Sequence, residues 1–512
     1  MLPETAPADV CLILEGTYPY VSGGVSSWAH ELIKMHKHLT FSVVTLVAAD
    51  ASTKMLYELP DNVVSLKTIR LQQIPQGAEL TSAEEKMLCD LLEPCLLKLQ
   101  STASLDDLQE AIDIISPWRG RVGKRTLLES QAAWDLLNRL YETTMPNTSF
   151  LDYFWSWRGL FGGLFSILLA DLPTAKVYHA LCTGYAGLML ARAHLETGRP
   201  CVVTEHGIYT NERRIEIASA TWIDDMHSFN LAVAGDQGER DIKDLWMDTF
   251  GNYSRFCYAA ASDIITLYEG NQEFQRMGGA APDKMRVIPN GINADLYASI
   301  ERMPHPPTVA LIGRVVPIKD IKTFIKAVQI LKKSFPNLRA FVLGSMDEDP
   351  AYARECVALI EHLQLKDTLT LTGEVNVRDY MGKIDILALT SISEAQPLVV
   401  LEAGAAGIPV VATDVGACRE MITSSPGEYS RLGPGGIVVD LCNPPAVAQA
   451  MHKLLADRAL YNRYGASARE RVRTHYRKED QRRLYAELYQ DLIDGKNVVI
   501  PYAIENKRAA YG

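Results

Sequence analysis

The 512-residue sequence lacks the clusters that mark metal-binding, disulfide-rich or nucleic-acid-binding proteins. Its nine cysteines are scattered and form no Cys-x-x-Cys pair or Cys/His group, which argues against a zinc site or disulfide framework and fits a reducing compartment. The net charge is −11 and no long basic run occurs. Because nucleic-acid backbones are bound by clustered Lys and Arg, this argues against a nucleic-acid-binding surface. We therefore expect no metal site and no nucleic-acid partner.

Long apolar runs are also missing. The longest uncharged stretches, 159–170 and 177–191, fall short of the roughly 18 to 20 residues that a helix needs to span a bilayer. The first basic residue is Lys34, so the start has no basic region of the kind that opens a secretory signal. We expect a cytoplasmic protein with no transmembrane segment of its own.

The pattern of apolar residues predicts two large α/β domains. Apolar strand-like runs alternate with helical periodicity near the start, which indicates βαβ units and a parallel sheet. Between about 75 and 160 the periodicity is only helical, which predicts a helical insertion. Three prolines in 301–308 indicate a linker, and a regular βα alternation follows it.

The fold class is thus α/β, with two Rossmann-like doubly wound parallel-sheet domains. We place the N-terminal domain at 1–300 and the second domain at 301–480. A final helix and tail, 481–512, is expected to cross back to the first domain. Two such domains joined by a hinge predict a cleft between the carboxyl ends of both sheets, where open α/β folds bind ligands.

Two carboxylates stand out in the apolar segment SISEAQPLVVLEAGAAGIPVVAT (391–413). A buried carboxylate is costly unless it is paired or hydrogen-bonded. Glu394 is expected in the loop after a buried strand, Pro397 at the first position of a helix, and Glu402 on that helix's second turn. They could merely cap the helix and pair with a basic neighbour, or they could bind a polar ligand.

A second candidate segment is LIGRVVPIKDIKTF. Gly313 ends a predicted strand, Arg314 and Lys319 lie in the following loop, and Asp320 is a plausible N-cap for the next helix. Two cations at the carboxyl end of a central strand can hold a diphosphate, although a solvated loop with ordinary surface charges would look the same.

Two further candidates lie in the first half. Gly23 and Gly24 separate a strand from a helix, where the backbone can approach a phosphate closely, but a plain tight turn is the simpler interpretation. His206 ends a buried strand and is expected to project into the cleft, unless it is a satisfied core histidine. His179 has a similar position with a weaker case. The dinucleotide fingerprint G-x-G-x-x-G is absent after both first strands, which disfavours a dehydrogenase.

Together these segments resemble the retaining glycosyltransferases of family 4, which have the GT-B architecture. The resemblance is carried by GGVSSW, TEHG, VIPNGIN, GRVVPIKDIKTFIKA, LTGEV and SISEAQPLVVLEAGAAGIPVVATDVG, and Glu394 and Glu402 fit the E-x7-E pattern. Within the family, EGTYPYVSGGVSSW and EHGIYTNERRIEI are most similar to the PelF subgroup, the cytosolic transferases of Pel exopolysaccharide synthesis.

The resemblance implies that 1–300 is the acceptor-side domain and that 301–480 is the nucleotide-sugar-binding domain. It also implies a role for each candidate residue. Glu394 and His206 would contact the donor sugar, and Glu402 would accept hydrogen bonds from the ribose of the nucleotide. Arg314 and Lys319 would neutralise the diphosphate. The remaining donor-binding positions are Gly23, Gly24, Asn290, Gly313, Glu374, Val375, Ala395, Gln396, Pro397, Leu398 and Val399, with Glu374 and Val375 in the segment that reads the base.

The activity implied is that of a hexosyltransferase (EC 2.4 class) that moves a sugar, with retention, from a UDP-sugar to a growing Pel-like exopolysaccharide. No cofactor or metal is expected, because two cations can stabilise the leaving diphosphate. A glycan acceptor and inner-membrane synthase or export proteins would be the partners. The sequence EAQPL replaces the family's E-G/P-F-G type, so the donor sugar cannot be carried over. A nucleotide-sugar-binding subunit with little turnover, or a GT-B epimerase or phosphorylase, are the alternatives.

Overall fold

The chain is described here by a computed structural model that covers residues 6–219, 240–423 and 432–496. It divides into two compact units, which are described separately. The N-terminal unit comprises Met1–Thr266, Gln272–Val287 and Tyr485–Gly512, and the C-terminal unit comprises Leu267–Asn271 and Ile288–Leu484. The division falls at 288 and 485, whereas the sequence analysis placed it at 301 and 481.

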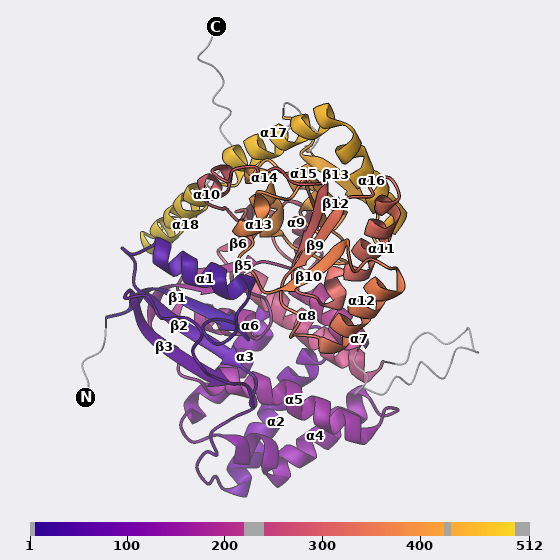
Figure 1. Ribbon diagram of the computed structural model, residues 1–512. Coiled ribbons are helices and arrows are strands. Elements are labelled where there is room, and N and C mark those ends of the chain that lie inside the picture. The colour runs from indigo at the N-terminus through magenta and orange to yellow at the C-terminus, as the bar shows by residue number, and fades with distance from the viewer. Residues whose placement is uncertain (1–5, 220–239, 424–431, 497–512) are drawn as a thin grey trace. The chain divides into compact units, whose positions relative to one another are not determined.

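The N-terminal unit is built on an all-parallel seven-stranded sheet in the order β3-β2-β1-β4-β5-β6-β7 (Figure 1). The strands are β1 Ala8–Glu15, β2 Phe41–Val47, β3 Val63–Arg70, β4 Ala175–Ala180, β5 Cys201–Glu205, β6 Asp263–Thr266 and β7 Met285–Val287. The sequence analysis missed β3. Because β3 is an edge strand that mixes polar residues with apolar ones and leaves Val64 56% exposed, it gives no continuous apolar run.

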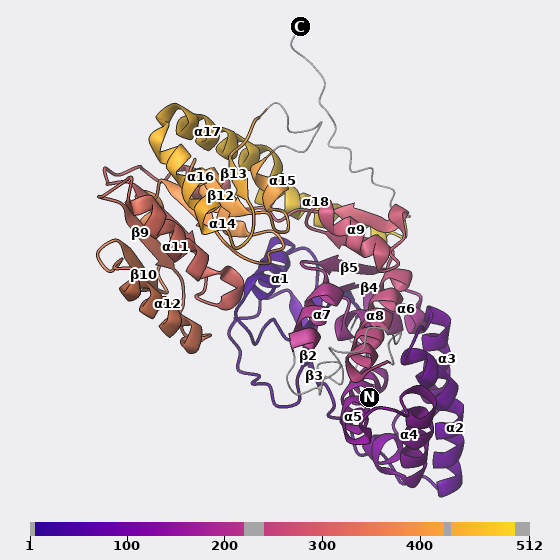
Figure 2. The same cartoon turned by 90° about the vertical axis from the view of Figure 1, so that its right-hand side faces the viewer.

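Helices cover this sheet and form the predicted insertion. The sheet-covering helices are α1 Gly24–Met35, α6 Tyr185–Thr197, α7 Tyr209–Ser219, α8 Ile242–Ala260 and α9 Gly270–Met277. The insertion contains α2 Ser82–Leu99, α3 Leu105–Ile115, α4 Gln131–Thr144 and α5 Phe150–Leu169, which lie together beside the sheet in Figures 1 and 2. Capping boxes start α2 at Thr81 and α3 at Ser104.

The C-terminal unit has an all-parallel six-stranded sheet in the order β10-β9-β8-β11-β12-β13. Its strands are β8 Thr308–Ile312, β9 Arg339–Leu343, β10 Leu369–Gly373, β11 Ile386–Leu389, β12 Val410–Thr413 and β13 Gly436–Val439. Its helices are α10 Ala294–Ala298, α11 Ile321–Lys332, α12 Pro350–His362, α13 Arg378–Met381, α14 Leu398–Ala405, α15 Cys418–Ile422, α16 Pro444–Ala456 and α17 Arg458–His475, followed by α18 Lys478–Ile493. The predicted α/β fold with two Rossmann-like sheets is confirmed.

In this C-terminal sheet the chain order reverses between β8 and β11, which are adjacent. Both strands are buried, because Val309, Ala310, Ile386 and Leu387 are at most 1% exposed. A ligand in an open α/β sheet binds at the carboxyl ends of the two strands that flank such a reversal. The fold therefore directs attention to the loops that follow β8 and β11.

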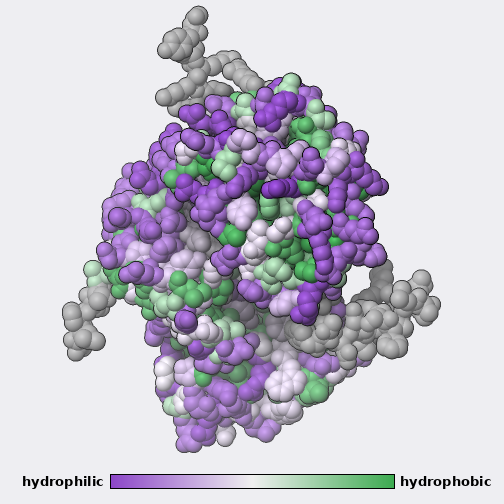
Figure 3. Space-filling model, in the orientation of Figure 1, coloured by the Kyte–Doolittle hydropathy of each residue, from purple (hydrophilic) through white to green (hydrophobic). Residues whose placement is uncertain are grey.

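On the face shown in Figure 3, hydrophilic side chains predominate and apolar ones occur in small groups between them. Within the described ranges, the structure contains no helix that is long and apolar enough to cross a membrane.

The last helix is anchored in the N-terminal unit by buried hydrogen bonds. The His179 ring lies between the hydroxyls of Tyr489 and Thr204, at 2.6 Å from Nδ1 and 2.8 Å from Nε2, and Tyr485 lies 3.0 Å from the Thr204 hydroxyl. Burial lowers the pKa of His179 from 6.5 to about 3. His179 is thus a satisfied core histidine that is neutral in the folded chain.

This burial predicts a pH-dependent stability. Because the folded pKa lies below the unfolded value of 6.5, the stability that neutral His179 contributes is present above pH 6.5 and is lost as the pH falls towards 3. In His179→Gln, the slope of the free energy of unfolding against pH between 6.5 and 4 should decrease by up to about one proton. Denaturant unfolding of the N-terminal unit at several pH values measures this slope. Tyr489→Phe should lower stability but keep the slope; an unchanged slope in His179→Gln would contradict the assignment.

Candidate functional site

The loops after β8 and β11 are tied together at the carboxyl edge of the C-terminal sheet. The Thr390 hydroxyl, directly after β11, donates to the carbonyl oxygens of Lys319 and Asp320 at 3.1 and 2.9 Å. Ile392 N–H donates to the Ile318 carbonyl at 2.8 Å. Asp320 also caps α11, as predicted, by accepting from Thr323 N–H at 3.2 Å. Lys319 and Glu394 are therefore held on neighbouring loops.

Lys319 and Glu394 form an ion pair at this edge. Lys319 Nζ lies 2.5 Å from Glu394 Oε1, and the Ser391 hydroxyl donates to the same oxygen at 2.5 Å. The two side chains are 21% and 11% exposed. The ion pair offsets the free-energy cost of burying the Glu394 carboxylate. It also places a cation and a carboxylate side by side at the carboxyl edge of the sheet.

A glycine, Gly416, packs closely against the backbone of the loop that carries Glu394. Gly416 has φ +51°, and a Cβ at this position would lie 2.1 Å from the Glu394 carbonyl oxygen. Ala417 N–H donates to the Ala395 carbonyl at 2.8 Å. The backbone of Glu394 and Ala395 is therefore fixed by a contact that only glycine permits.

Glu402 lies on α14, as predicted, but its partner is not a basic residue. Tyr297 of α10 hydrogen-bonds to it, and burial raises the pKa of the carboxyl. Pro397 was predicted to be the first helical residue of α14, but it is the N-cap, and the helix begins one residue later with Leu398 and Val399 in its first turn. The helix start is therefore directed at the loop that carries Glu394.

Gln396 braces the same loop. Its Oε1 accepts from Asn290 N–H at 2.7 Å, and Gln481 Oε1 accepts from Gly291 N–H at 3.1 Å. Gln396 and Asn290 are 6% and 7% exposed. The carbonyl oxygen of the EAQPL glutamine thus joins the helix start to the segment after β7, whereas its Nε2 is buried with no hydrogen-bond partner among the described residues.

Arg314 takes a different partner from Lys319. Its guanidinium pairs with Glu348 in the loop after β9, and both side chains are about half exposed. Glu348 lies within an Asp-x-Asp triplet, 347–349, but Asp347 accepts from Ser345 and Asp349 caps α12 through Tyr352 N–H. The described ranges contain no group of three or more His, Cys, Asp or Glu side chains that could hold a metal ion.

The other C-terminal candidates lie at the same sheet edge. Gly313 directly follows β8. Gly344, at the end of β9, lies so close to it that a Cβ on Gly344 would be 2.2 Å from the Gly313 carbonyl oxygen. Glu374 and Val375 follow β10; Glu374 is exposed, and Val375 is half-buried against the apolar cluster beneath α14.

His206, Gly23 and Gly24 belong to the N-terminal unit. His206 follows β5, its ring centroid lies 4.7 Å from that of Trp28, and burial lowers its pKa to about 4. Its Nε2 is buried with no hydrogen-bond partner among the described residues. Gly23 is the N-cap of α1, and a Cβ at Gly23 or Gly24 would meet nothing within 4 Å. Packing therefore does not require glycine at either position.

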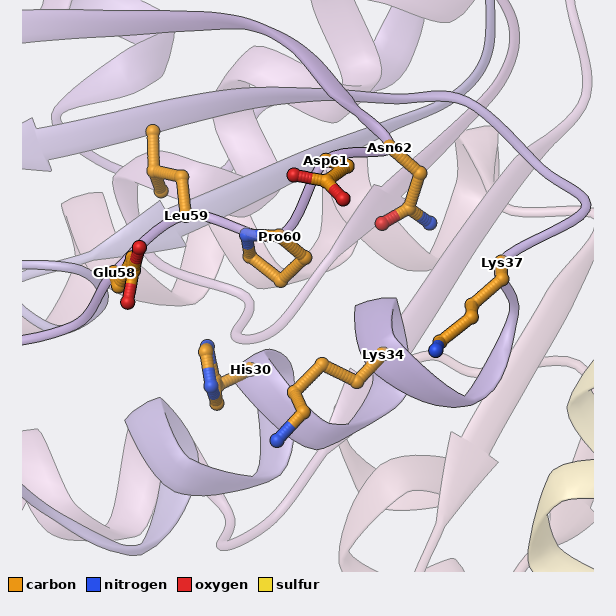
Figure 4. A pocket seen from close by; sticks show the side chains of 8 residues that line it. All are labelled: His30, Lys34, Lys37, Glu58, Leu59, Pro60, Asp61 and Asn62. Atoms are coloured by element: carbon orange, nitrogen blue, oxygen red, sulfur yellow. The ribbon is translucent and has the colours of Figure 1, made fainter.

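A mixed-charge hollow lies elsewhere in the N-terminal unit (Figure 4). There Lys34 and Lys37, on and just after α1, lie across from residues 58–62. Asn62 closes this loop on the end of α1 by donating to the carbonyls of Ile33, His36 and Leu39 at 3.0 to 3.2 Å. The hollow lies at the amino ends of β2 and β3, away from the edge that binds ligands in such folds.

Sequence reasoning missed several residues of the C-terminal site. Ser391 and Gly416 lie within or next to the quoted motif, but their contacts depend on the tertiary fold. Thr390 ends an apolar strand and Tyr297 belongs to a short helix outside any motif. No spacing in the sequence links Tyr297 to Glu402.

Two family models match the chain. One, described as glycosyl transferases group 1, matches residues 298–471. The other, described as a domain of unknown function (DUF3492), matches residues 8–283, just over half of the chain. The chain belongs to the DUF3492 family. Its residues 298–471 are similar to the group 1 glycosyltransferases, which supports glycosyltransferase activity.

Individual proteins that are similar to this chain are named as transferases. A D-inositol 3-phosphate glycosyltransferase from Xylanimonas cellulosilytica is 27% identical over 313 residues, which cover 56% of this chain and 72% of the relative. An exopolysaccharide phosphotransferase, SCO2592, from Streptomyces coelicolor is 30% identical over 215 residues, 41% of this chain and only 21% of the relative.

Solved structures of glycosyltransferases share the fold of this chain. The sucrose-phosphate synthase of Thermosynechococcus elongatus has a TM-score of 0.55 at 17% identity, with 95% of this chain and 100% of that chain covered. Anabaena Alr3699/HepE, crystallised with UDP, has a TM-score of 0.57 at 14% identity, with 94% and 99% covered. This glycosyltransferase therefore has the GT-B architecture.

Proposed function

We propose that this glycosyltransferase moves a sugar, with retention of anomeric configuration and without a metal, from a UDP-sugar to a growing exopolysaccharide of the Pel type. The observation that carries the proposal is the Lys319–Glu394 pair at the strand-order reversal between β8 and β11. At this position, beside the start of α14, Lys319 would bind the diphosphate and Glu394 would bind hydroxyls of the sugar.

The chemical task explains the need for a cation. As the bond to the anomeric carbon breaks, the nucleoside diphosphate takes up negative charge, and a preorganised cation lowers that barrier. Lys319 and Arg314 would supply this charge. Lys319 is paired with Glu394 and Arg314 with Glu348. The diphosphate would therefore either bind to these cations alongside the carboxylates or displace the carboxylates from them. Retention would follow from attack by the acceptor on the face that the diphosphate leaves, with the acceptor proton passing to the departing phosphate.

The remaining candidates have supporting roles. Glu402, held by Tyr297, would accept hydrogen bonds from the ribose, and Glu374 and Val375 would lie near the base. His206 would offer its neutral imidazole to the donor sugar, since burial lowers its pKa to about 4. Gly23 and Gly24 leave the start of α1 open to a phosphate.

Similar proteins support UDP as the nucleotide and an exopolysaccharide as the product. Anabaena Alr3699/HepE was crystallised with UDP and with UDP-glucose, and one relative is named an exopolysaccharide phosphotransferase. The Pel assignment comes from the segments EGTYPYVSGGVSSW and EHGIYTNERRIEI. A cytoplasmic enzyme that hands its product to inner-membrane synthase or export proteins would fit this role.

A panel of UDP-, GDP- and ADP-sugars tests the proposal. With a glycan acceptor, a UDP-sugar should release UDP and extend the glycan, and NMR of the product should show the donor's anomeric configuration. UDP binding without release, even with acceptor and partner proteins, would instead indicate a nucleotide-sugar-binding subunit. An epimerised UDP-sugar or a sugar phosphate would indicate an epimerase or a phosphorylase.

Removing either cation should slow the transfer. Lys319→Ala or Arg314→Ala should lower turnover at least tenfold, because a charge-stabilising group is commonly worth about 3–4 kcal/mol in the transition state. Steady-state UDP release measures this, with the melting temperature as a check on folding. The matched control is Lys322→Ala. Lys322 lies in the same sequence segment as Arg314 and Lys319, and it pairs with Glu355. Wild-type turnover in both Lys319→Ala and Arg314→Ala would refute the leaving-group assignment.

Removing the ribose carboxylate should weaken nucleotide binding. Glu402→Ala should raise the dissociation constant of UDP by about tenfold or more, since a hydrogen bond to a charged group contributes about 1.5–3 kcal/mol. Calorimetry measures the affinity. Glu420→Ala removes a half-buried glutamate that accepts from the backbone N–H groups of Glu269 and Gly270, so it should leave UDP binding unchanged. Equal affinities for Glu402→Ala and wild type would count against the ribose role.

A further inference from the structure

The mixed-charge hollow in the N-terminal unit has a volume of about 390 Å³, which falls within the range of small-molecule sites (Figure 4). It lies at the amino ends of β2 and β3. The carboxyl edge of the same sheet holds a separate cavity, whose lining includes Glu15, Arg213 and the rings of Tyr185, Trp246 and Phe250. The hollow is therefore an independent space, and none of the roles proposed above uses it.

Side chains of opposite charge line the two walls of the hollow. His30, Lys34 and Lys37 lie at positions i, i+4 and i+7, so they share one face of α1 and the turn that follows it. Glu58 and Asp61 lie on the segment that leads into β3, across the hollow from α1 (Figure 4). The lining thus offers two cations on one side and two carboxylates on the other.

These charges do not neutralise one another by direct contact. Among the residues that the structure describes, Lys37, Glu58 and Asp61 have no partner in an ion pair, and all three are exposed. Lys34 lies 3.4 Å from Glu31, on its own helix. Charges of both signs are therefore available to a ligand that lies between the two walls.

The backbone holds the two walls apart. The three hydrogen bonds of the Asn62 side chain fix its segment on the end of α1. Phe41 N–H donates to the Asn62 carbonyl at 2.8 Å, and Val63 N–H donates to the Pro60 carbonyl at 2.9 Å. Because the segment with the carboxylates is fixed in this way, the space between the walls is built into the fold, and a ligand would find it preorganised.

His30 adds a polar edge to the α1 wall but no third charge. Its Nδ1 lies 3.3 Å from the Tyr18 hydroxyl. Burial and the neighbouring Lys34 ammonium lower the pKa of His30, so its ring is neutral at pH 7. The α1 wall therefore carries the two positive charges of Lys34 and Lys37, which equal the two negative charges of the facing wall.

We infer that this hollow binds a small zwitterion of about the size of an amino-sugar phosphate, with a phosphate towards the lysines and an ammonium towards the carboxylates. A phosphate carries a charge of about −1.5 to −2 near pH 7, which suits two lysines. An ammonium has three N–H donors, which suit two carboxylates. A purely anionic ligand would be repelled by Glu58 and Asp61, and a purely cationic one by Lys34 and Lys37.

Three probes of similar size test this charge pattern in the full-length chain. Glucosamine 6-phosphate carries both charges, glucose 6-phosphate carries only the phosphate, and glucosamine carries only the ammonium. Calorimetry at pH 7 and low ionic strength measures their affinities, because salt screens exposed charges. UDP is kept in excess so that the proposed donor site does not contribute. Glucosamine 6-phosphate should bind the wild-type chain at least tenfold more tightly than either of the other probes.

Two variants of exposed side chains separate the two walls. Asp61→Asn should weaken the binding of glucosamine 6-phosphate at least fivefold, but glucose 6-phosphate should bind as well as before or better, because a repulsive charge is removed. Lys37→Met should weaken the binding of both phosphates at least fivefold and leave that of glucosamine within twofold. Melting temperatures check that both variants fold.

The matched controls are Asp50→Asn and Lys54→Met. Asp50 and Lys54 are exposed, lie on the same connection between β2 and β3, and do not line the hollow. Both controls should bind each probe within twofold of wild type. A loss of glucosamine 6-phosphate binding in Asp50→Asn as large as that in Asp61→Asn would overturn the assignment to the hollow.

The remaining outcomes decide the ligand class and its source. Equal wild-type affinities for glucosamine 6-phosphate and glucose 6-phosphate, or no binding of either, would overturn the zwitterion. The same chemistry occurs in the headgroup of phosphatidylethanolamine, so vesicles of this lipid, with phosphatidylcholine vesicles as the control, provide a second arm. Sedimentation with the former that Asp61→Asn abolishes would support the site with a lipid headgroup as its ligand, and binding of the soluble probe alone would support it with a free metabolite. Since UDP release is not measured, these results stand or fall separately from the proposed glycosyl transfer.

Discussion

The ion pair between Lys319 and Glu394 is the contact on which the account of the donor site depends. Each residue lies on a loop that leaves one of two adjacent strands, and the strand order reverses between those strands. Thr390 and Ser391 fasten the two loops, and Gly416 supports the Glu394 backbone. A half-buried carboxylate is tolerated here because a cation and a hydroxyl satisfy it. Under the proposed function, the same arrangement would offer both charges to a sugar diphosphate.

The same topological rule applies in each unit. In the C-terminal sheet the reversal gathers a lysine and a glutamate beside the start of α14, where we propose that the nucleotide sugar binds. In the N-terminal sheet it gathers Glu15, Arg213 and three aromatic rings around a cavity. The chemistry of each site thus follows from which side chains the loops bring to the carboxyl edge.

The sequence predicted most of the fold because parallel strands buried on both faces appear as continuous apolar runs, as in β1, β8 and β11. The edge strand β3 was missed, since the polar residues within it interrupt any such run. At the proposed donor site, the positions of Glu394, Lys319, Asp320 and Glu402 on their elements followed from spacing. Their partners did not, because Tyr297 and Gln481 reach the site through tertiary contacts that no local pattern encodes.

The most direct test of the donor site is a crystal structure of this chain with UDP bound. The account predicts that a phosphate oxygen lies within hydrogen-bonding distance of Lys319 Nζ and that the ribose hydroxyls contact Glu402. A diphosphate bound elsewhere, with the Lys319–Glu394 pair untouched by the nucleotide, would contradict it.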